Sequence, residues 1–508
     1  MNLTHDTVLH ASPLETLARD GITVLIDPAG PNWIGTDERG RRILELFDGA
    51  RTFDQVVRAY AAEATVEFVA AWQHTDTLAR DAIRRGMLAD APIVRPPYRG
   101  RASHLEPRRL SELWLHTNNS CNLACSHCLV SSGPDGDRGL STSTLLRLIA
   151  DARVLGARRF FFTGGEPFLR KDILSLIDAA LEDLKAELAI LSNGILFTPT
   201  RLEELATRDR SRMKIQISLD GSTPAVNDPI RGAGSYERII DGIRAAISAG
   251  LSVTVSTVIT ETNADDVPSV TRLVGALGGT THHLLWLHKR GRAEHGGPDR
   301  TPPVERVIDV IRHAREVGRA VGVIIDNHEA MKTRLRYPAG TKRDLAGAGV
   351  SSLCVYSDGL VYPSAALAGV PALACGSIHE HALKDIWLGS PVTRTFASTT
   401  VEGKPICTTC TFKFLCGGGD IEHAYFYGGS INAHDPYCEL HQAMFADALH
   451  DLIEERKALV TNRRSGFSAP IVYTGMGESA VTCATDETPG EVMTSRSECV
   501  LTFDLDAP

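Results

Sequence analysis

Three cysteines stand close together at Cys121, Cys125 and Cys128, in the spacing CxxxCxxC. They follow a short apolar stretch, residues 113–116, that is typical of a strand. Three thiolates at this spacing can converge on one soft metal centre, and thiolates favour iron–sulfur clusters or zinc. Three ligands leave one iron of a four-iron cluster open to a substrate or cofactor. The alternative is a zinc site in which His127 supplies the fourth ligand.

The cysteine loop resembles the cluster loop of the radical S-adenosylmethionine (SAM) enzymes. The next expected strand ends in a run that matches the GGEP motif of that family, and the run consists of Gly164, Gly165, Glu166 and Pro167. Paired glycines let a backbone approach a ligand closely, and the carboxylate of Glu166 can accept hydrogen bonds from the amine of methionine. An ordinary β-turn is the alternative, but it does not account for the cysteine loop that precedes the motif.

The resemblance implies further SAM contacts at the ends of later strands. Short polar side chains there can bind the ribose hydroxyls or the methionine carboxylate, an arginine can pair with that carboxylate, and a valine can pack on the adenine. The candidates are Ser192, Asn193, Ser218, Asp220, Arg231 and Val258. Ordinary turn chemistry is the alternative for the polar ones.

The resemblance also implies a SAM-binding [4Fe-4S] cluster and an external one-electron reductant such as flavodoxin or ferredoxin. SAM would be cleaved to methionine and a 5′-deoxyadenosyl radical, which abstracts an unactivated hydrogen atom. The cofactors supply this chemistry, while the protein orients the substrate and excludes water. The radical is generated at the three-cysteine cluster, so no catalytic side chain is assigned.

Six further cysteines lie between residues 354 and 438, and they are Cys354, Cys375, Cys407, Cys410, Cys416 and Cys438. The run CxxCxxxxxC that begins at the third of them resembles the SPASM domain, which carries two auxiliary iron–sulfur clusters. The resemblance implies that one auxiliary [4Fe-4S] cluster is held by Cys407, Cys410, Cys416 and Cys438. A four-cysteine zinc site is the alternative for these residues.

The second auxiliary cluster has an uncertain ligand set and an uncertain nuclearity. Position 420, where the SPASM pattern continues with a cysteine, holds an aspartate. The resemblance therefore implies that Cys354, Cys375 and Asp420 hold this cluster, with His423 or an open iron as alternatives to Asp420. A carboxylate is a harder ligand than a thiolate and is expected to change the reduction potential.

The elements that must position these residues form an α/β pattern from residue 111 to residue 330. Expected strands lie at 113–116, 159–163, 188–192, 214–219, 252–259 and 283–288. Expected helices lie at 142–155, 173–184, 236–249, 267–277 and 304–317. Repeated βα units imply a parallel sheet, and six of them predict a partial, TIM-like (β/α)6 barrel, the core fold of the resembled family. A parallel barrel places its chemistry at the carboxyl ends of the strands, where the cysteine loop lies.

Residues 1–92 form a separate unit. Its expected strands lie at 22–26 and 32–35, and its expected helices at 38–47, 53–62 and 66–87. This order predicts a small winged-helix-like α+β domain, and it resembles the PqqD-like leader-peptide recognition domains, typified by the peptide chaperone of pyrroloquinoline quinone biosynthesis. The resemblance implies binding of a precursor peptide, whose strand can extend an exposed sheet edge. A DNA-binding winged helix and a structural cap are the alternatives.

The rest of the chain divides into a linker at 93–110, a cysteine-rich SPASM domain at 345–445, and a C-terminal helix and tail at 446–508. The cysteine-rich part has little periodic core and is expected to fold around its metals. The net charge of −9 argues against nucleic-acid binding. No apolar run reaches the ~20 residues that span a bilayer, and the first residues lack a secretory pattern. We therefore expect a cytoplasmic protein without nucleic-acid or membrane partners, whose cysteines hold metals rather than disulfides.

Together these features predict a radical SAM enzyme that modifies a ribosomal peptide or a small protein. The strings Cys128-Leu-Val-Ser-Ser-Gly-Pro and Cys416-Gly-Gly-Gly-Asp resemble two subgroups, the thioether-forming maturases of quinohemoprotein amine dehydrogenase and the geopeptide-type maturases. Cysteine thioethers are the expected product, with carbon–carbon cross-links and epimerisation left open. The alternatives are an enzyme that acts on a small molecule or cofactor precursor, and a noncatalytic, metal-stabilised scaffold that binds peptides.

Overall fold

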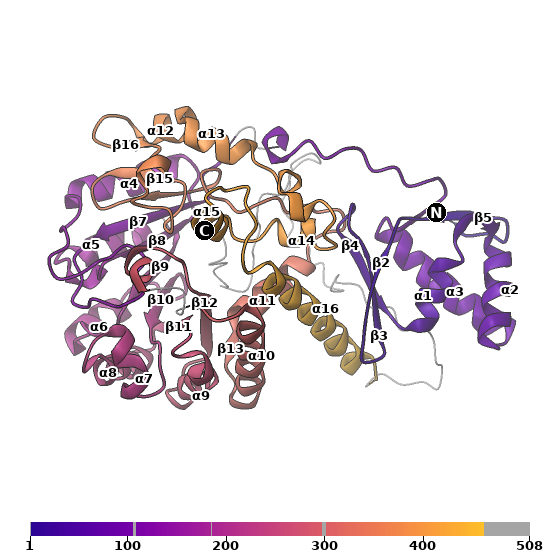
Figure 1. Cartoon of the computed structure of the whole chain (residues 1–508), viewed down its shortest axis with the longest axis horizontal. Coiled ribbons are helices and arrows are strands. Elements are labelled where there is room, and N and C mark those ends of the chain that lie inside the picture. Colours follow the sequence, from indigo (N-terminus) through magenta and orange to yellow (C-terminus); the bar gives the residue numbers. More distant parts are fainter. Residues whose placement is uncertain (1, 105–107, 184, 297–300, 462–508) are drawn as a thin grey trace.

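The computed structural model describes residues 2–104, 108–183, 185–296 and 301–461. A barrel forms one end of the molecule and an N-terminal module, in indigo, forms the other, with the helix α16 between them (Figure 1). The tail predicted after this helix lies outside the described residues.

Six parallel strands form the wall of the barrel. They are β7 (Glu112–Asn118), β8 (Arg159–Gly164), β9 (Glu187–Ser192), β10 (Met213–Ser218), β11 (Ser252–Ile259) and β12 (Thr281–Trp286). Each strand pairs in parallel with the next one along the chain. The predicted partial α/β barrel is confirmed, although its sixth strand, Thr281–Trp286, begins and ends earlier than the expected 283–288.

Helices cover the outside of these strands. They are α4 (Thr142–Val154), α5 (Ile173–Asp178), α6 (Pro199–Ala206), α7 (Pro224–Arg231), α8 (Ser235–Ser248), α9 (Val267–Ala276) and α10 (Val304–Val321). The helix expected at 173–184 is divided, because a π-helical turn, Ala179–Asp183, follows α5.

The strands have two different apolar faces. Leu113 and Leu115 of β7 pack with the outer helical layer. Trp114, between them, belongs to a separate cluster and stacks on Phe161 of β8, with ring centroids 3.9 Å apart. Because successive side chains of a strand point to opposite faces, the second cluster lines the inside of the barrel.

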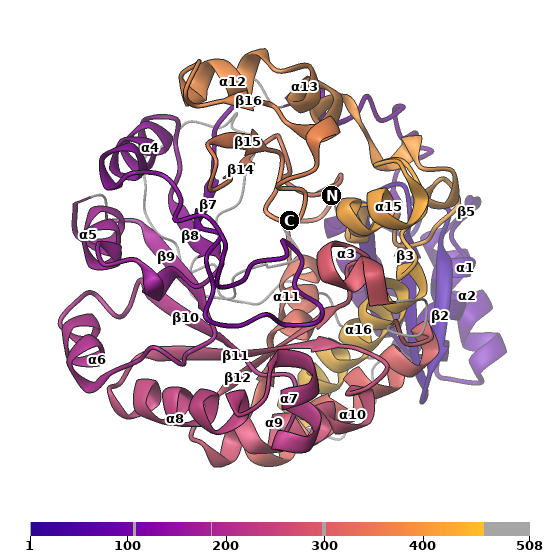
Figure 2. The same ribbon diagram turned by 60° about the vertical axis from the view of Figure 1, so that its left-hand side comes forward.

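The barrel sheet is extended at both edges, by β13 beside β12 and by three strands of the cysteine-rich part beside β7. The added strands are β13 (Ile324–Ile325), β14 (Ser352–Val355), β15 (Leu360–Tyr362) and β16 (Gly376–Ser377). β14 runs parallel to β7, and β15 and β16 follow in antiparallel order, at the top of the end-on view in Figure 2. Leu353, Val355 and Val361 are buried in the barrel core. The first strands of the cysteine-rich part therefore share the apolar core of the barrel, a contribution to its packing that the sequence pattern did not predict.

Six further helices complete this half of the chain. They are α11 (Asp326–Leu335), α12 (Leu383–Gly389), α13 (Pro391–Ser398), α14 (Lys413–Cys416), α15 (Ile421–Gly428) and α16 (Cys438–Thr461). The C-terminal helix thus begins at Cys438, before the expected boundary at residue 446. Within the described ranges no helix combines the length and hydrophobicity needed to cross a membrane.

The N-terminal module contains two small antiparallel sheets and three helices. Its elements are β1 (Val8–Ala11), β2 (Glu15–Arg19), β3 (Ile22–Asp27), β4 (Asn32–Thr36), α1 (Glu38–Glu45), β5 (Asp48–Thr52), α2 (Phe53–Ala64), α3 (Phe68–Arg84) and β6 (Leu88–Ala89). The strand orders are β2-β3-β4 and β5-β1-β6. The predicted pairing of 22–26 with 32–35 is confirmed, and the three helices lie where they are expected.

The middle strand β3 joins this module to the rest of the molecule. Ile22, Val24 and Ile26 pack in one core with the apolar face of α16. Leu25 points to the opposite side and packs with α1, α2 and α3. The sheet β2-β3-β4 therefore lies between the module's helices and α16, as Figure 1 shows.

Candidate active site

The two glycines of the GGEP run lie directly against the start of the cysteine loop. The N–H of Gly165 donates to the carbonyl oxygen of Asn118, and the N–H of Glu166 donates to that of Ser120, both at 2.9 Å. A Cβ at Gly165 would lie 1.9 Å from the Ser120 oxygen, and one at Gly164 would lie 2.1 Å from the Asn118 oxygen. Only glycine fits at these positions, so the run fixes the position of the cysteine loop.

Glu166 ties the ends of β8 and β9 together. Its carboxylate is 0% exposed and accepts hydrogen bonds from the Ser192 hydroxyl (2.9 Å), the Asn193 N–H (2.8 Å) and the Phe168 N–H (3.1 Å). Burial raises the pKa of Glu166, although these three donors favour its charged form. Pro167 begins a single 3-10 turn that closes the corner. The structure brings four predicted residues together here, and a contact between Glu166 and the methionine amine stays a prediction.

Asn193 and Ser218 lie at the carboxyl ends of neighbouring strands. The side-chain amide of Asn193 donates to Oδ1 of Asn122 at 2.8 Å and lies 3.9 Å from Sγ of Cys121. Ser218 is the half-buried last residue of β10. Asn193 therefore faces the first cysteine of the loop, a contact that its place in the sequence does not reveal.

Asp220 connects three parts of the site through one carboxylate. Oδ1 accepts from the N–H of Val258 at 2.9 Å. Oδ2 lies 2.6 Å from Nε2 of His127 and 2.8 Å from Nε of Arg231. Burial alone would raise the pKa of Asp220, but the charges of Arg231 and His127 lower it to about 2. His127 is thus held by Asp220, which disfavours the alternative of a zinc site with His127 as fourth ligand.

Two arginines approach the second cysteine. Nη1 of Arg231 lies 3.9 Å from Sγ of Cys125. The side-chain Nε of Arg292 donates to the carbonyl oxygen of Cys125 at 2.6 Å. The backbone N–H of Arg292 donates to the carbonyl oxygen of Cys128 at 3.1 Å. The only signal for Arg292 in the sequence is a basic turn after the sixth strand. The structure directs Arg231 to Asp220 and Cys125, and its pairing with the SAM carboxylate stays a prediction.

The three loop cysteines fit an iron–sulfur cluster. All three are partly exposed, in a loop that lies across the barrel opening (Figure 2). Burial, the nearby charge of Glu166 and the other two thiolates raise the pKa of Cys121 to about 12. The mutual effect shows that the three sulfur atoms are close together, and a cationic iron centre would offset this accumulation of charge.

The four cysteines expected to hold one auxiliary cluster also converge. They line one small pocket, and they are Cys407, Cys410, Cys416 and Cys438. Burial and the charges of the other three raise the pKa of Cys407 to about 12. The N–H of Gly419 lies 3.3 Å from Sγ of Cys416, and the amide of Gln442 lies 3.5 Å from Sγ of Cys438. Such N–H donors to sulfur are typical of cluster sites, so the pocket fits a four-thiolate metal centre.

The residues expected to hold the second auxiliary cluster are not brought together in the same way. Cys354 is 0% exposed and packs with Trp114 inside the barrel. Cys375, beside β16, packs with the outer core. Asp420 caps the N-terminus of α15, where Oδ1 accepts from two backbone N–H groups. The ligand set of this cluster stays a prediction.

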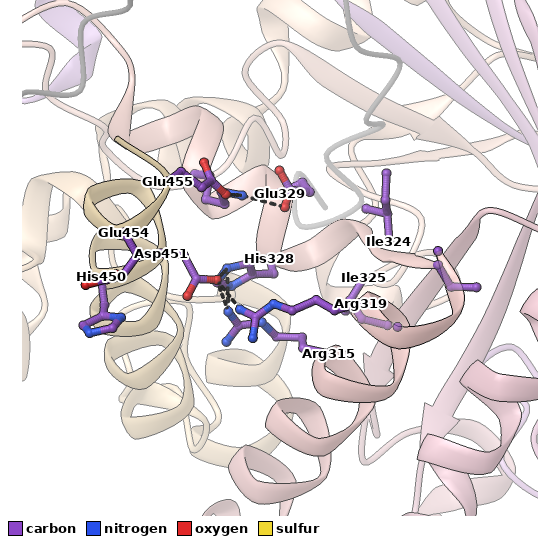
Figure 3. Close-up of a pocket in the computed structure, with 14 residues that line it drawn as sticks. Arg315, Arg319, Ile324, Ile325, His328, Glu329, His450, Asp451, Glu454 and Glu455 are labelled. Carbon is purple, nitrogen blue, oxygen red and sulfur yellow. Dashed lines mark hydrogen bonds and ion pairs between the residues drawn. The ribbon is translucent and has the colours of Figure 1, made fainter. Parts of the chain in front are cut away.

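A cavity of about 600 Å³ lies away from all the predicted site residues, between α10, β13, α11 and α16 (Figure 3). Charged side chains line it in pairs. Asp451 lies between Arg315 and His328, and Nζ of Lys332 lies 2.9 Å from Glu329. This network joins α16 to the barrel and carries no predicted cofactor contact.

Residues 115–274 match the model of the radical SAM superfamily. The PqqA peptide cyclase of Methylocella silvestris is 27% identical over 359 residues, which cover 69% of this chain and 94% of that protein. The AdoMet-dependent heme synthase of Methanosarcina barkeri is 28% identical over 342 residues, which cover 63% of this chain and 93% of that protein. The crystal structure of Streptococcus suis SuiB bound to precursor peptide SuiA aligns with a TM-score of 0.50 at 15% identity, over 84% of this chain and 99% of that one.

The barrel, the cysteine loop and these comparisons define the class of the molecule: it is a radical SAM enzyme. More particularly, it is similar to the PqqA peptide cyclase and to the mycofactocin maturase MftC of Mycolicibacterium smegmatis, which is 27% identical over 321 residues that cover 63% of this chain and 80% of that protein.

Proposed function

We propose that this enzyme modifies a ribosomally made peptide or a small protein, and that it forms cross-links such as cysteine thioethers. The observation that carries the proposal is the open edge of β2. Among the described strands, β2 pairs only with β3, and four of its five residues are exposed. An edge of this kind is the surface on which an extended peptide can add a strand.

The relatives support a peptide substrate. One relative is named for the peptide that it cyclises, and the SuiB structure contains a precursor peptide. We therefore propose that residues 1–92 are a PqqD-like domain that receives a precursor. The strings around Cys128 and Asp420 favour the thioether-forming subgroups named above.

The residues of the site have separable roles in this proposal. Cys121, Cys125 and Cys128 would hold a [4Fe-4S] cluster, which together with SAM supplies a hydrogen-abstracting radical. Arg231 and Arg292 bring positive charge to the cysteine loop and offset the negative charge of its thiolates. The GGEP glycines hold the loop at a fixed distance from the ends of the strands.

The auxiliary centres complete the proposed cofactor set. The four-cysteine pocket would hold one auxiliary [4Fe-4S] cluster, and a second cluster of open nuclearity would involve Cys354 and Cys375. Flavodoxin or ferredoxin is the proposed class of electron donor.

Anaerobically reconstituted enzyme tests the radical chemistry. With SAM and a one-electron reductant we expect 5′-deoxyadenosine from the wild type and none from the Cys121→Ala, Cys125→Ala, Cys128→Ala triple variant. The triple variant is expected to keep the auxiliary iron and sulfide. SAM cleavage by the triple variant would contradict the assignment of the cluster.

Small peptides encoded beside the gene test the substrate. A thioether removes two hydrogens from the peptide and blocks alkylation of one cysteine, and both changes are visible by mass spectrometry. Enzyme that cleaves SAM but leaves every bound precursor peptide unchanged would contradict peptide modification.

A small-molecule substrate is the second candidate, and the similarity to the heme synthase favours it. In that case precursor peptides would not bind to the full-length enzyme, and a small acceptor would instead raise the yield of 5′-deoxyadenosine. Binding measured by fluorescence anisotropy of labelled peptides separates the two candidates.

A further inference from the structure

Two histidines and one aspartate meet beside the end of β12. His288 follows this strand, while Asp420 and His423 lie at the start of α15. One imidazole nitrogen from each histidine and one carboxylate oxygen all lie within 4.8 Å of one another. The imidazole rings are stacked, with centroids 4.0 Å apart and planes at 23°. Because the carboxyl end of a barrel strand is where chemistry is placed, the group lies on the functional side of the molecule.

The imidazole nitrogens of this group have unused bonding capacity. Within the described part of the chain, Nδ1 of His288 and both ring nitrogens of His423 are buried without a hydrogen-bond partner. Nδ1 of His423 lies 3.3 Å from Oδ2 of Asp420 but makes no hydrogen bond to it. Buried polar atoms are nearly always paired, so an unpaired set points to a missing partner. A metal ion is a partner that satisfies several imidazole nitrogens at once.

Asp420 presents one oxygen to the histidines because the other is occupied. Oδ1 accepts hydrogen bonds from the N–H groups of Glu422 (2.7 Å) and His423 (3.0 Å), as expected of an N-cap. The N–H of Asp420 donates to Oδ2 of Asp435 at 2.7 Å, which fixes the backbone. The orientation of Oδ2 is therefore set before any ligand arrives, as in metal sites whose ligands are held by neighbouring hydrogen bonds.

We propose that His288, Asp420 and His423 bind one divalent transition-metal ion, zinc or iron(II), at a mononuclear site separate from the iron–sulfur clusters. Two imidazoles and one carboxylate form a donor set that suits both ions and leaves coordination positions open. Among the described residues, the group that meets within 4.8 Å contains no thiolate. Cys354 and Cys375 pack in other clusters, and Cys416, which shares a small cavity with Asp420, lies with Cys407, Cys410 and Cys438 in the four-cysteine pocket.

Metal and sulfide analysis of the reconstituted holoenzyme, loaded with Zn²⁺, tests the site. The variants are His288→Gln and His423→Gln, and the matched control is His313→Gln, an exposed histidine of α10. We expect one zinc per chain in the wild type and the control, and zinc affinity lowered by at least about tenfold in the two variants. Iron and acid-labile sulfide are expected to stay unchanged in all four proteins. X-ray absorption at the zinc edge is expected to show only nitrogen and oxygen ligands at about 2.0–2.2 Å.

Each other result overturns the proposal. Loss of sulfide together with iron in the histidine variants would make these residues ligands of a cluster. Sulfur in the zinc coordination shell would place the ion at a cysteine site, and equal zinc content in variants and control would exclude binding here. If the glutamine variants do not fold, Asp420→Asn replaces them, since asparagine keeps the N-cap; it must lower zinc affinity without lowering sulfide.

Discussion

At the scale of single residues, Asp220 has the most connected position in the site. One buried carboxylate holds His127 of the cysteine loop, Arg231 at the end of α7 and the backbone of β11. The three segments are far apart in the sequence, so their relative position depends on this one side chain. Loss of its charge would leave Arg231, whose side chain is 7% exposed, without a counterion.

We expect Asp220→Asn to lower the free energy of unfolding by about 3–5 kcal/mol at pH 7, because a buried charge loses its partner. The pKa of Asp220 is lowered to about 2, below the ~3.9 of an unfolded chain. Its contribution is therefore complete above about pH 4 and is lost as the pH falls toward 2. Urea unfolding at pH 7 measures the effect, with the exposed pair partner Asp241→Asn as control. Equal losses in the two variants would contradict the role of Asp220.

Gly165 offers a second test at this scale. A methyl group there would collide with the Ser120 oxygen, whereas a Cβ at Gly133, in the same loop region, meets nothing within 4 Å. We expect Gly165→Ala to displace the cysteine loop and to lower SAM cleavage by about 100-fold, and Gly133→Ala to be near wild type. Iron content and 5′-deoxyadenosine yield are the measurements. Wild-type activity of Gly165→Ala would show that the loop can move without cost.

The positions of the site residues could be predicted from the sequence better than their partners. The cysteine and glycine motifs are local patterns, so the spacing alone located Cys121 and Gly164 at the ends of the right strands. The contacts of Glu166 with Ser192, or of Asp220 with His127, depend on how separate loops meet. No local pattern contains that information, and for the same reason His288 was not expected to lie beside Asp420 and His423.

At the scale of elements, β3 shows how a strand can belong to two cores. Its alternation predicts a strand, but all six of its residues are buried because α16 covers the face that would otherwise meet water. Its neighbour β2 was not predicted, since Leu17 is its only large apolar residue and the strand is mostly exposed. The strands β14–β16 were not predicted because they are short and because β14 pairs with β7, which begins at Glu112, far outside the local window of a strand pattern.

Trp33 of β4 tests whether this sheet is a joint. It is 2% exposed, and its Nε1 donates to the carbonyl oxygen of Leu335 in α11 at 3.0 Å. We expect Trp33→Ala to cost about 3–5 kcal/mol of unfolding free energy, as large-to-small changes in a core do. Trp72→Ala is the control. Trp72 is half-buried, and the aromatic rings that it contacts within the described part of the chain all belong to the N-terminal module. Chemical unfolding measures both, and a smaller loss for Trp33 than for Trp72 would contradict a joint at β4.

At the scale of the whole molecule, the N-terminal module is part of a continuous core rather than an appendage. Arg19 of β2 pairs with Asp447 of α16 at 2.8 Å, beside the apolar contact of β3 with the same helix. The predicted domain boundary near residue 92 divides the sequence, but side chains on both sides of it pack in one apolar core.

Deletion of residues 1–92 is expected to expose the apolar face of α16. The truncated chain should lose soluble yield and SAM cleavage together, because an uncovered apolar patch promotes association and weakens the fold. Soluble yield and 5′-deoxyadenosine formation are measured side by side with the full-length chain. A soluble truncated enzyme with undiminished SAM cleavage would show that the module is independent.

α16 begins at Cys438, in the four-cysteine pocket, and its later turns carry the surface on which the N-terminal module rests. A single rigid element thus spans both a predicted iron ligand and a docking surface. If Cys438 holds iron as proposed, iron loading and module docking share one helix, and any coupling between them would act equally in both directions. We then expect a chain without iron in this pocket to hold residues 1–92 less firmly, and the proposed precursor to bind to it less well.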